Sequence, residues 1–283
     1  MLFLLRWLAR WPLWLLHALG SALGWLTYAL SPSYRARLCA NARLAGVDEP
    51  ARRASIGEAG RLVSELPRLW LRPPRQPIDD PVRWEGAEFM QSLLDEGRGV
   101  VLLTPHMGSF EVSAQAYAER FGRTQPITVL YRPARKRWLR ELEETARARP
   151  ALSTAPASLA GVRQMLRALR RGETVGLLPD QVPPEGMGAW VPFFGQPAYT
   201  MTLAARLVQQ TGAAVGVLWT ERLPRGAGYV VRALPLAEPL PEHGDEASAA
   251  ALNRAMEAVI RQCPAQYLWG YHRYKAPRRV DAS

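Results

Sequence analysis

A histidine and a glutamate stand five positions apart in the segment TPHMGSFE at 104–111. An imidazole can take a proton from a hydroxyl group near neutral pH, and a carboxylate can hold that imidazole in one tautomer and stabilise its charged form. On one continuous helix, side chains five positions apart would point away from each other. We therefore expect His106 on a loop and Glu111 in the first turn of a helix that Ser109 caps, so that the two side chains meet.

Short apolar runs alternate with amphipathic stretches on both sides of this segment. The pattern predicts strands at 99–104, 127–131, 174–178, 213–220 and 229–233, and helices at 86–96, 109–121, 134–147, 158–171, 200–211 and 247–261. Such alternation indicates an α/β fold with a central, mostly parallel sheet flanked by helices. His106 and Asp180 each follow a predicted strand, and we expect both at the carboxyl edge of the sheet, where open α/β sheets bind ligands.

The first thirty residues are strongly apolar, and no formally charged residue occurs from Trp11 to Leu30. A helix over this stretch would be about 30 Å long, enough to cross a hydrocarbon core. Tryptophans within it, and arginines on both sides, also suit a helix that lies in the plane of a membrane. We predict a membrane-anchoring helix at 1–30 and leave both arrangements open.

A proline-rich stretch, RPPRQPIDDP at 72–81, suggests a boundary further along the chain. Before it, apolar residues recur at helical spacing and predict one helix over 33–72. The predicted organisation is therefore an anchor at 1–30, a helical membrane-proximal region with the linker at 31–81, and a catalytic domain at 82–283.

The charge balance is basic, with 36 Lys and Arg against 25 Asp and Glu among 283 residues, a net charge of +11. Scattered arginines without a recognition motif argue against nucleic-acid binding. Cys39 and Cys263 are too few for a disulfide framework, which favours a reducing, cytosol-facing location.

Other enzyme classes are poorly supported by the motifs present. Neither cysteine lies near His106 and Glu111, so a zinc site lacks an evident third ligand. The chain has no Gly-x-Ser-x-Gly nucleophile motif, and the glycine pair at 186–188 lacks the third glycine of a dinucleotide-binding loop. We therefore expect neither a metal nor a redox cofactor.

The spacing of His106 and Glu111 resembles the His-(four residues)-acid motif of the glycerolipid and lysophospholipid acyltransferases. Its glutamate form is similar to the branch that acylates lipid A, the late lauroyl/myristoyl acyltransferases of Gram-negative bacteria. Further blocks resemble that branch in the same order along the chain, at 129–133, 161–163, 171–181, 191–195 with Thr200, and 266–275. The likeness covers nearly the whole chain, and the apolar N-terminus is also typical of the branch.

The resemblance implies an O-acyltransferase at the cytoplasmic face of the inner membrane. Its donor would be an acyl–acyl carrier protein and its acceptor a hydroxyl group of a lipid A precursor. His106 would act as general base with Glu111 as its partner. The expected substrate-binding residues are Arg132, Arg163, Asp180 and Gln181. The guanidinium groups of the two arginines suit both a developing oxyanion and acceptor phosphates.

The basic stretch at 134–140 is a candidate docking site for the acidic carrier protein. Two alternatives stay open at this point. The acceptor could be another lyso-lipid or glycolipid, or the chain could be a non-catalytic, basic protein that binds membrane surfaces.

Overall fold

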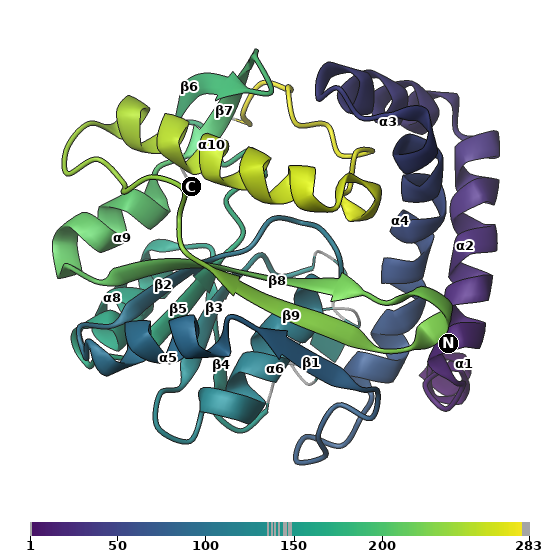
Figure 1. The fold of residues 1–283 in the computed structure, drawn as a ribbon, viewed down its shortest axis with the longest axis horizontal. Coiled ribbons are helices and arrows are strands. Elements are labelled where there is room, and N and C mark those ends of the chain that lie inside the picture. The colour runs from purple at the N-terminus through teal and green to yellow at the C-terminus, as the bar shows by residue number, and fades with distance from the viewer. Residues whose placement is uncertain are drawn as a thin grey trace.

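The computed structural model describes residues 2–134, 136, 138, 140, 142–143, 146 and 149–278. Its centre is a seven-stranded sheet with the order β1-β9-β8-β2-β5-β3-β4 (Figure 1). Strands β8 and β9 pair antiparallel, and the other neighbours in this sheet pair parallel. The predicted mostly parallel α/β architecture is therefore confirmed. The strands are β1 (Val82–Glu85), β2 (Val100–Leu103), β3 (Ile127–Tyr131), β4 (Leu152–Pro156), β5 (Thr174–Leu177), β8 (Ala214–Arg222) and β9 (Tyr229–Leu234).

Helices cover both faces of the sheet (Figure 1). One face packs against α5 (Ala87–Asp95) and α6 (Phe110–Phe121), and the other against α8 (Leu159–Arg170), α9 (Leu203–Thr211) and α10 (Asp245–Gln262). Strand β2 shows the alternation behind these layers. Val100 and Leu102 join the core beneath α5 and α6, whereas Val101 and Leu103 join the opposite core. Burial on both faces explains why this strand is a continuous apolar run.

The helix predicted over 33–72 is wrong as a single element. The structure has α3 (Pro32–Leu44) and α4 (Glu49–Trp70) with a break between them. Gly46 takes the left-handed conformation, with φ of 69°, just after α3 ends. The Asp48 side chain then accepts a hydrogen bond from the backbone N–H of Ala51, and a proline in the first turn starts α4.

The apolar N-terminus forms α1 (Leu2–Leu8) and α2 (Leu13–Leu30), separated near Pro12. Helix α2 is long and apolar enough to cross a membrane. It runs antiparallel beside α4 (Figure 1). The Ser64 hydroxyl on α4 donates to the Leu16 carbonyl on α2 at 2.7 Å. The two backbones touch at glycines, because a Cβ added to Gly60 would collide with the carbonyl oxygen of Gly20. Large apolar side chains exposed on α2 are Trp14, Leu23, Trp25, Leu26 and Leu30.

Several elements were absent from the sequence prediction. Besides β1 and β4, a separate hairpin forms from β6 (Gly188–Phe193) and β7 (Gln196–Met201). Because Thr200 and Met201 complete β7, the helix predicted from 200 begins only at Leu203. Short 3-10 helices occur at η1 (Pro224–Gly226) and η2 (Pro264–Gln266). The helix predicted at 134–147 lies partly outside the described residues.

Candidate functional site

His106 and Asp180 meet because they follow neighbouring parallel strands. In the register of β2 and β5, Leu103 lies opposite Leu177, and each polar residue comes three positions after its strand partner. His106 Nδ1 lies 2.6 Å from Asp180 Oδ1. The backbone N–H of His106 also donates to Asp180 Oδ2 at 2.9 Å. One carboxylate therefore holds both the ring and the backbone of the histidine.

Asp180 is buried but stays ionised. Burial alone would raise its pKa, but the charge of His106, the two hydrogen bonds from that residue and the charge of Arg273 together outweigh burial. The pKa of Asp180 consequently lies below its ordinary value of 3.8.

The ionised carboxylate determines which nitrogen of the imidazole is available. A carboxylate can only accept hydrogen bonds, so Nδ1 of His106 must carry the proton that it shares with Asp180. In the neutral ring Nε2 then has a free lone pair. The side chain is 18% exposed, and its ring lies edge-on to Phe110 at a centroid distance of 5.2 Å. The arrangement suits a general base that receives a proton on Nε2.

Glu111 occupies the first turn of α6, as predicted, but the carboxylate that holds the His106 ring is Asp180. Glu111 is buried, and its Oε2 accepts a hydrogen bond from the Trp70 indole at 3.3 Å. Ser109 stands at the N-cap of α6, yet its hydroxyl forms no capping bond. The local spacing and the motif resemblance pointed to Glu111, whereas the pairing of β2 with β5 brings Asp180 into contact with the His106 ring. A catalytic role for Glu111 stays a prediction.

The turn between β2 and α6 is held by its backbone. Thr104 N–H donates to Leu177 O, Gly108 N–H to Gln266 O and Ser109 N–H to Thr220 O, at 2.8–3.0 Å. Gly108 has a φ of 55°, and a Cβ there would collide with the carbonyl oxygen of Thr220. Only glycine fits this position, for reasons of both conformation and space.

Arg132 follows β3 at the same sheet edge and belongs to a basic cluster. The pKa of Lys275 is lowered, first by burial and then by the positive charges of Arg278 and Arg132. The Lys275 ammonium lies 5.1 Å from the centre of the Tyr271 ring, and the Tyr271 hydroxyl accepts from Val182 N–H. The cluster therefore lies beside the loop that carries Asp180.

Two predicted substrate-binding residues remain, Gln181 and Arg163. Gln181 is half-buried beside Asp180. Arg163 is exposed on α8, which follows β4, two strands away from β5. Of the predicted set, the structure thus brings His106 and Asp180 into direct contact, and Arg132 near them.

Two residues of the site were missed by sequence reasoning. Arg273 is 2% exposed and donates to Tyr199 O at 2.7 Å and Thr200 Oγ1 at 2.6 Å, and its charge helps to keep Asp180 ionised. Tyr267 has a pKa raised well above its ordinary value, first by burial and then by the negative charge of Asp180. Both lie in the segment 266–275, whose resemblance to the acyltransferase branch was the available signal, although it did not point to these two residues. Within the described ranges, no group of three or more His, Cys, Asp or Glu could hold a metal ion.

Comparisons with known proteins agree on one family. The sequence profile described as bacterial lipid A biosynthesis acyltransferase matches residues 1–276. The chain is 28% identical over 220 residues to the lipid A biosynthesis lauroyltransferase of Escherichia coli K12, which covers 76% of this chain and 69% of that protein. It is 27% identical over 192 residues to the palmitoleoyltransferase of the same organism, covering 68% of this chain and 60% of that protein. It is 23% identical over 225 residues to the lipid A biosynthesis myristoyltransferase of Escherichia coli K12, covering 78% of this chain and 68% of that protein.

Proposed function

The chain belongs to the bacterial lipid A biosynthesis acyltransferase family and is an acyltransferase, and we propose that it moves a fatty acyl chain from an acyl–acyl carrier protein to a hydroxyl group of a lipid A precursor. The observation that carries this proposal is the imidazole of His106, held on Nδ1 by an ionised Asp180 at the sheet edge. This is the arrangement that acyl transfer to a hydroxyl group requires of its base.

In the proposed reaction, Nε2 of His106 takes the proton of the acceptor hydroxyl while its oxygen attacks the thioester carbonyl. The carbon–oxygen bond forms, the carbon–sulfur bond breaks, and the carrier thiolate leaves with the proton from His106. Asp180 stabilises the imidazolium formed during this transfer. We assign Glu111 as a second acidic partner of His106, whose negative charge favours the same imidazolium and whose side chain Trp70 orients.

Substrate binding is assigned to the cations at the same edge. In the transition state, negative charge develops on the carbonyl oxygen and needs a donor. The cluster of Arg132, Lys275 and Arg278 provides positive charge beside the Asp180 loop and also suits acceptor phosphates. Arg163 and Gln181 complete the proposed substrate-binding set. In the stretch 134–140, proposed to dock the carrier protein, Lys136 and Arg140 are exposed, and residues 135 and 137 lie outside the described residues.

The surroundings of the two cysteines support direct transfer, in which no acyl chain is first bound to the enzyme. Burial, followed by the negative charges of Glu221 and Glu58, raises the pKa of Cys263 to about 11, so its thiol is neutral and a weak nucleophile. The Cys39 sulfur lies within 3.2–3.3 Å of the Arg52 guanidinium and the Tyr28 hydroxyl.

For the membrane, we propose that α1 and α2 lie in the plane of the inner membrane at its cytoplasmic side. The apolar face of α2 that turns away from α4 carries tryptophan and leucine, which suits the interfacial region. Its opposite face is bound to α4, which carries seven Arg or Glu residues over its length. Helix α2 would have to leave this partner in order to cross the bilayer alone.

The proposal is tested by mass spectrometry of lipid A from cells that lack the protein, complemented with wild type, His106→Ala or His243→Ala. His243 is exposed in a loop, which makes its substitution a matched control. We expect one acyl mass to vanish on deletion and to return with wild type and His243→Ala only. Purified His106→Ala should lose at least about 10³-fold in kcat. Restoration of the acyl mass by His106→Ala would exclude the proposed base.

An unchanged lipid A in the deletion strain would contradict the proposed acceptor. Comparison of all lipids from the same strains would then show whether another lyso-lipid or glycolipid is acylated.

A further inference from the structure

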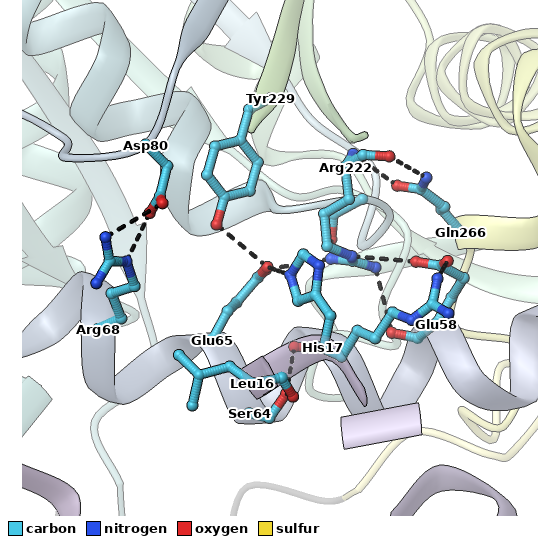
Figure 2. Close-up of polar contacts among 12 residues, drawn as sticks. Leu16, His17, Glu58, Ser64, Glu65, Arg68, Asp80, Arg222, Tyr229 and Gln266 are labelled. Carbon is cyan, nitrogen blue, oxygen red and sulfur yellow. Dashed lines mark hydrogen bonds and ion pairs between the residues drawn. The ribbon is translucent and has the colours of Figure 1, made fainter. Parts of the chain in front are cut away.

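A buried network of ion pairs and hydrogen bonds connects α2 and α4 with Arg222 (Figure 2). The same arginine contacts the turn that carries His106. At the centre of the network is Arg222, at the end of β8 and 3% exposed. Its Nε donates to Glu58 Oε2 at 3.1 Å, and its Nη1 lies 3.2 Å from Glu65 Oε1, both on α4. The same Nη1 donates to the carbonyl oxygen of Gly108 at 2.6 Å. One guanidinium thus contacts both α4 and the turn.

Gln266 binds both Arg222 and the backbone of this turn. Its side-chain amide accepts from Arg222 N–H and donates to Arg222 O, each at 2.9 Å (Figure 2). Its own carbonyl accepts from Gly108 N–H at 3.0 Å. Gly108 lies two residues after His106. Its backbone carbonyl binds Arg222 and its N–H binds Gln266, and these two residues are also bonded to each other.

The network continues to α2, the helix with the exposed apolar face. Glu65 is fully buried and lies 3.0 Å from His17 Nε2 on α2, and it accepts from the Tyr229 hydroxyl at 3.3 Å (Figure 2). Burial would lower the pKa of Arg222, but the charges of Glu65 and Glu58 outweigh it and raise that pKa. Arg222 is thus a permanent cation, and it is compensated only while α4 stays in place.

We propose that Arg222 is a positioning residue that couples the α2–α4 helix pair to the His106 turn; the role rests on the proposed function of His106. The turn packs closely against β8, because a Cβ on Gly108 would collide with the carbonyl oxygen of Thr220. Without the guanidinium, the Gly108 carbonyl would lose its donor, and the turn could move relative to Asp180. Displacement of a catalytic group by about 1 Å can cost about 10²-fold in rate.

The test compares Arg222→Lys with the control Arg68→Met in the full chain. Arg68 also anchors α4, since its guanidinium donates to Asp80 at 2.7 Å (Figure 2). It donates to the Trp11 carbonyl as well, at 3.2 Å, and neither partner belongs to the His106 turn. Two readouts are needed: hydrogen exchange of the peptide covering 104–110, and kcat and KM for acyl transfer. Lysine keeps the charge but cannot reach Glu58, Glu65 and Gly108 at once, because it lacks the planar fork.

We expect Arg222→Lys to speed exchange in 104–110 by at least about tenfold and to lower kcat by about the same factor, with KM within about twofold. Arg68→Met should change neither exchange in this peptide nor kcat by more than about twofold. Glu65→Gln, which keeps the shape of the side chain, replaces Arg222→Lys if that variant does not fold.

Unchanged exchange in 104–110 of a folded variant would overturn the positioning role, whatever the activity. If the wild type transfers no acyl chain but Arg222→Lys still speeds exchange in 104–110, the proposed function alone would be overturned.

Discussion

At the scale of single residues, Asp180 determines the chemistry that His106 can perform. An ionised carboxylate on Nδ1 leaves Nε2 as the only basic nitrogen, and the lowered pKa of Asp180 keeps it ionised throughout the physiological range. The low-pH limb of the activity profile should therefore not come from the titration of this carboxylate.

Asp180→Asn tests whether the carboxylate on Nδ1 keeps Nε2 of His106 free to act as the base. The amide can donate to Nδ1 and so favours the tautomer in which Nε2 carries the proton, and we expect kcat to fall by about 10⁴-fold. Steady-state kinetics of the folded variant measure this loss. Glu111→Gln provides the comparison, because it also removes one negative charge but leaves Nδ1 bound to Asp180. A smaller loss in Asp180→Asn than in Glu111→Gln would contradict the assignment.

Asp180 should also make stability depend on pH in a defined direction. Its pKa in the folded protein lies below the ordinary 3.8, so the ionised side chain stabilises the fold above that pH, and this contribution is lost as the pH falls through the lowered pKa. We expect the free energy of unfolding of Asp180→Asn to lie about 1–3 kcal/mol below that of wild type at neutral pH. Urea unfolding should show the difference narrow towards a pH of about 3. A difference that is the same at both pH values would contradict the linkage.

At the scale of elements, the contact between α2 and α4 depends on glycine. Gly20 and Gly60 bring the two backbones together, and the Ser64 hydroxyl then reaches the Leu16 carbonyl. This closeness also places His17 on Glu65 and so completes the network around Arg222. Small residues at this interface thus serve the His106 turn indirectly.

Gly60→Val should push these helices apart. Valine has a higher helix propensity than glycine, so a loss of stability would come from the collision with Gly20. We expect the free energy of unfolding to fall by about 1–3 kcal/mol or more, measured by chemical denaturation. Ala54→Val places the same side chain on an exposed position of α4 and should change stability by less than about 0.5 kcal/mol. Equal stability of the two variants would show that the helices are not in close contact.

At the scale of the whole molecule, the pair of α2 and α4 stands beside one end of the sheet (Figure 1). Arg222 joins α4 to the turn that carries His106, so this turn lies close to the helix pair. The buried pair of His17 and Glu65 ties α2 to α4. Pulling α2 into a bilayer would break this pair, leaving His17 buried in lipid without its partner and Glu65 without one of its hydrogen bonds. These contacts support the proposal that α2 lies in the plane of the membrane and does not cross it.

This arrangement predicts that both ends of the chain lie on one side of the membrane. In sealed spheroplasts, tags at the N-terminus and the C-terminus should both resist external protease, and both should be cleaved in inverted vesicles. The C-terminal tag serves as the internal control for the side on which the sheet lies. Cleavage of the N-terminal tag alone from outside would show that α2 spans the bilayer.

How much of this could be read from the sequence depends on the range of the interactions. The apolar run of β2, the amphipathic helices and the loop position of His106 follow from local patterns, because burial and backbone conformation are set within a few residues. The break between α3 and α4 also had local signals, Gly46 and Asp48, which the longer apolar periodicity obscured.

The partners of the functional side chains were decided by tertiary structure. Asp180 reaches His106 from 74 positions away because β5 pairs with β2, and Arg222 reaches Gly108 because β8 pairs with the other edge of β2. Strand order follows from how all layers pack together, and no spacing along the chain encodes it. Local patterns were therefore enough to predict the type of fold, the apolar N-terminus and the proposed catalytic histidine. The packed sheet determined which carboxylate contacts that histidine and which arginine contacts its turn.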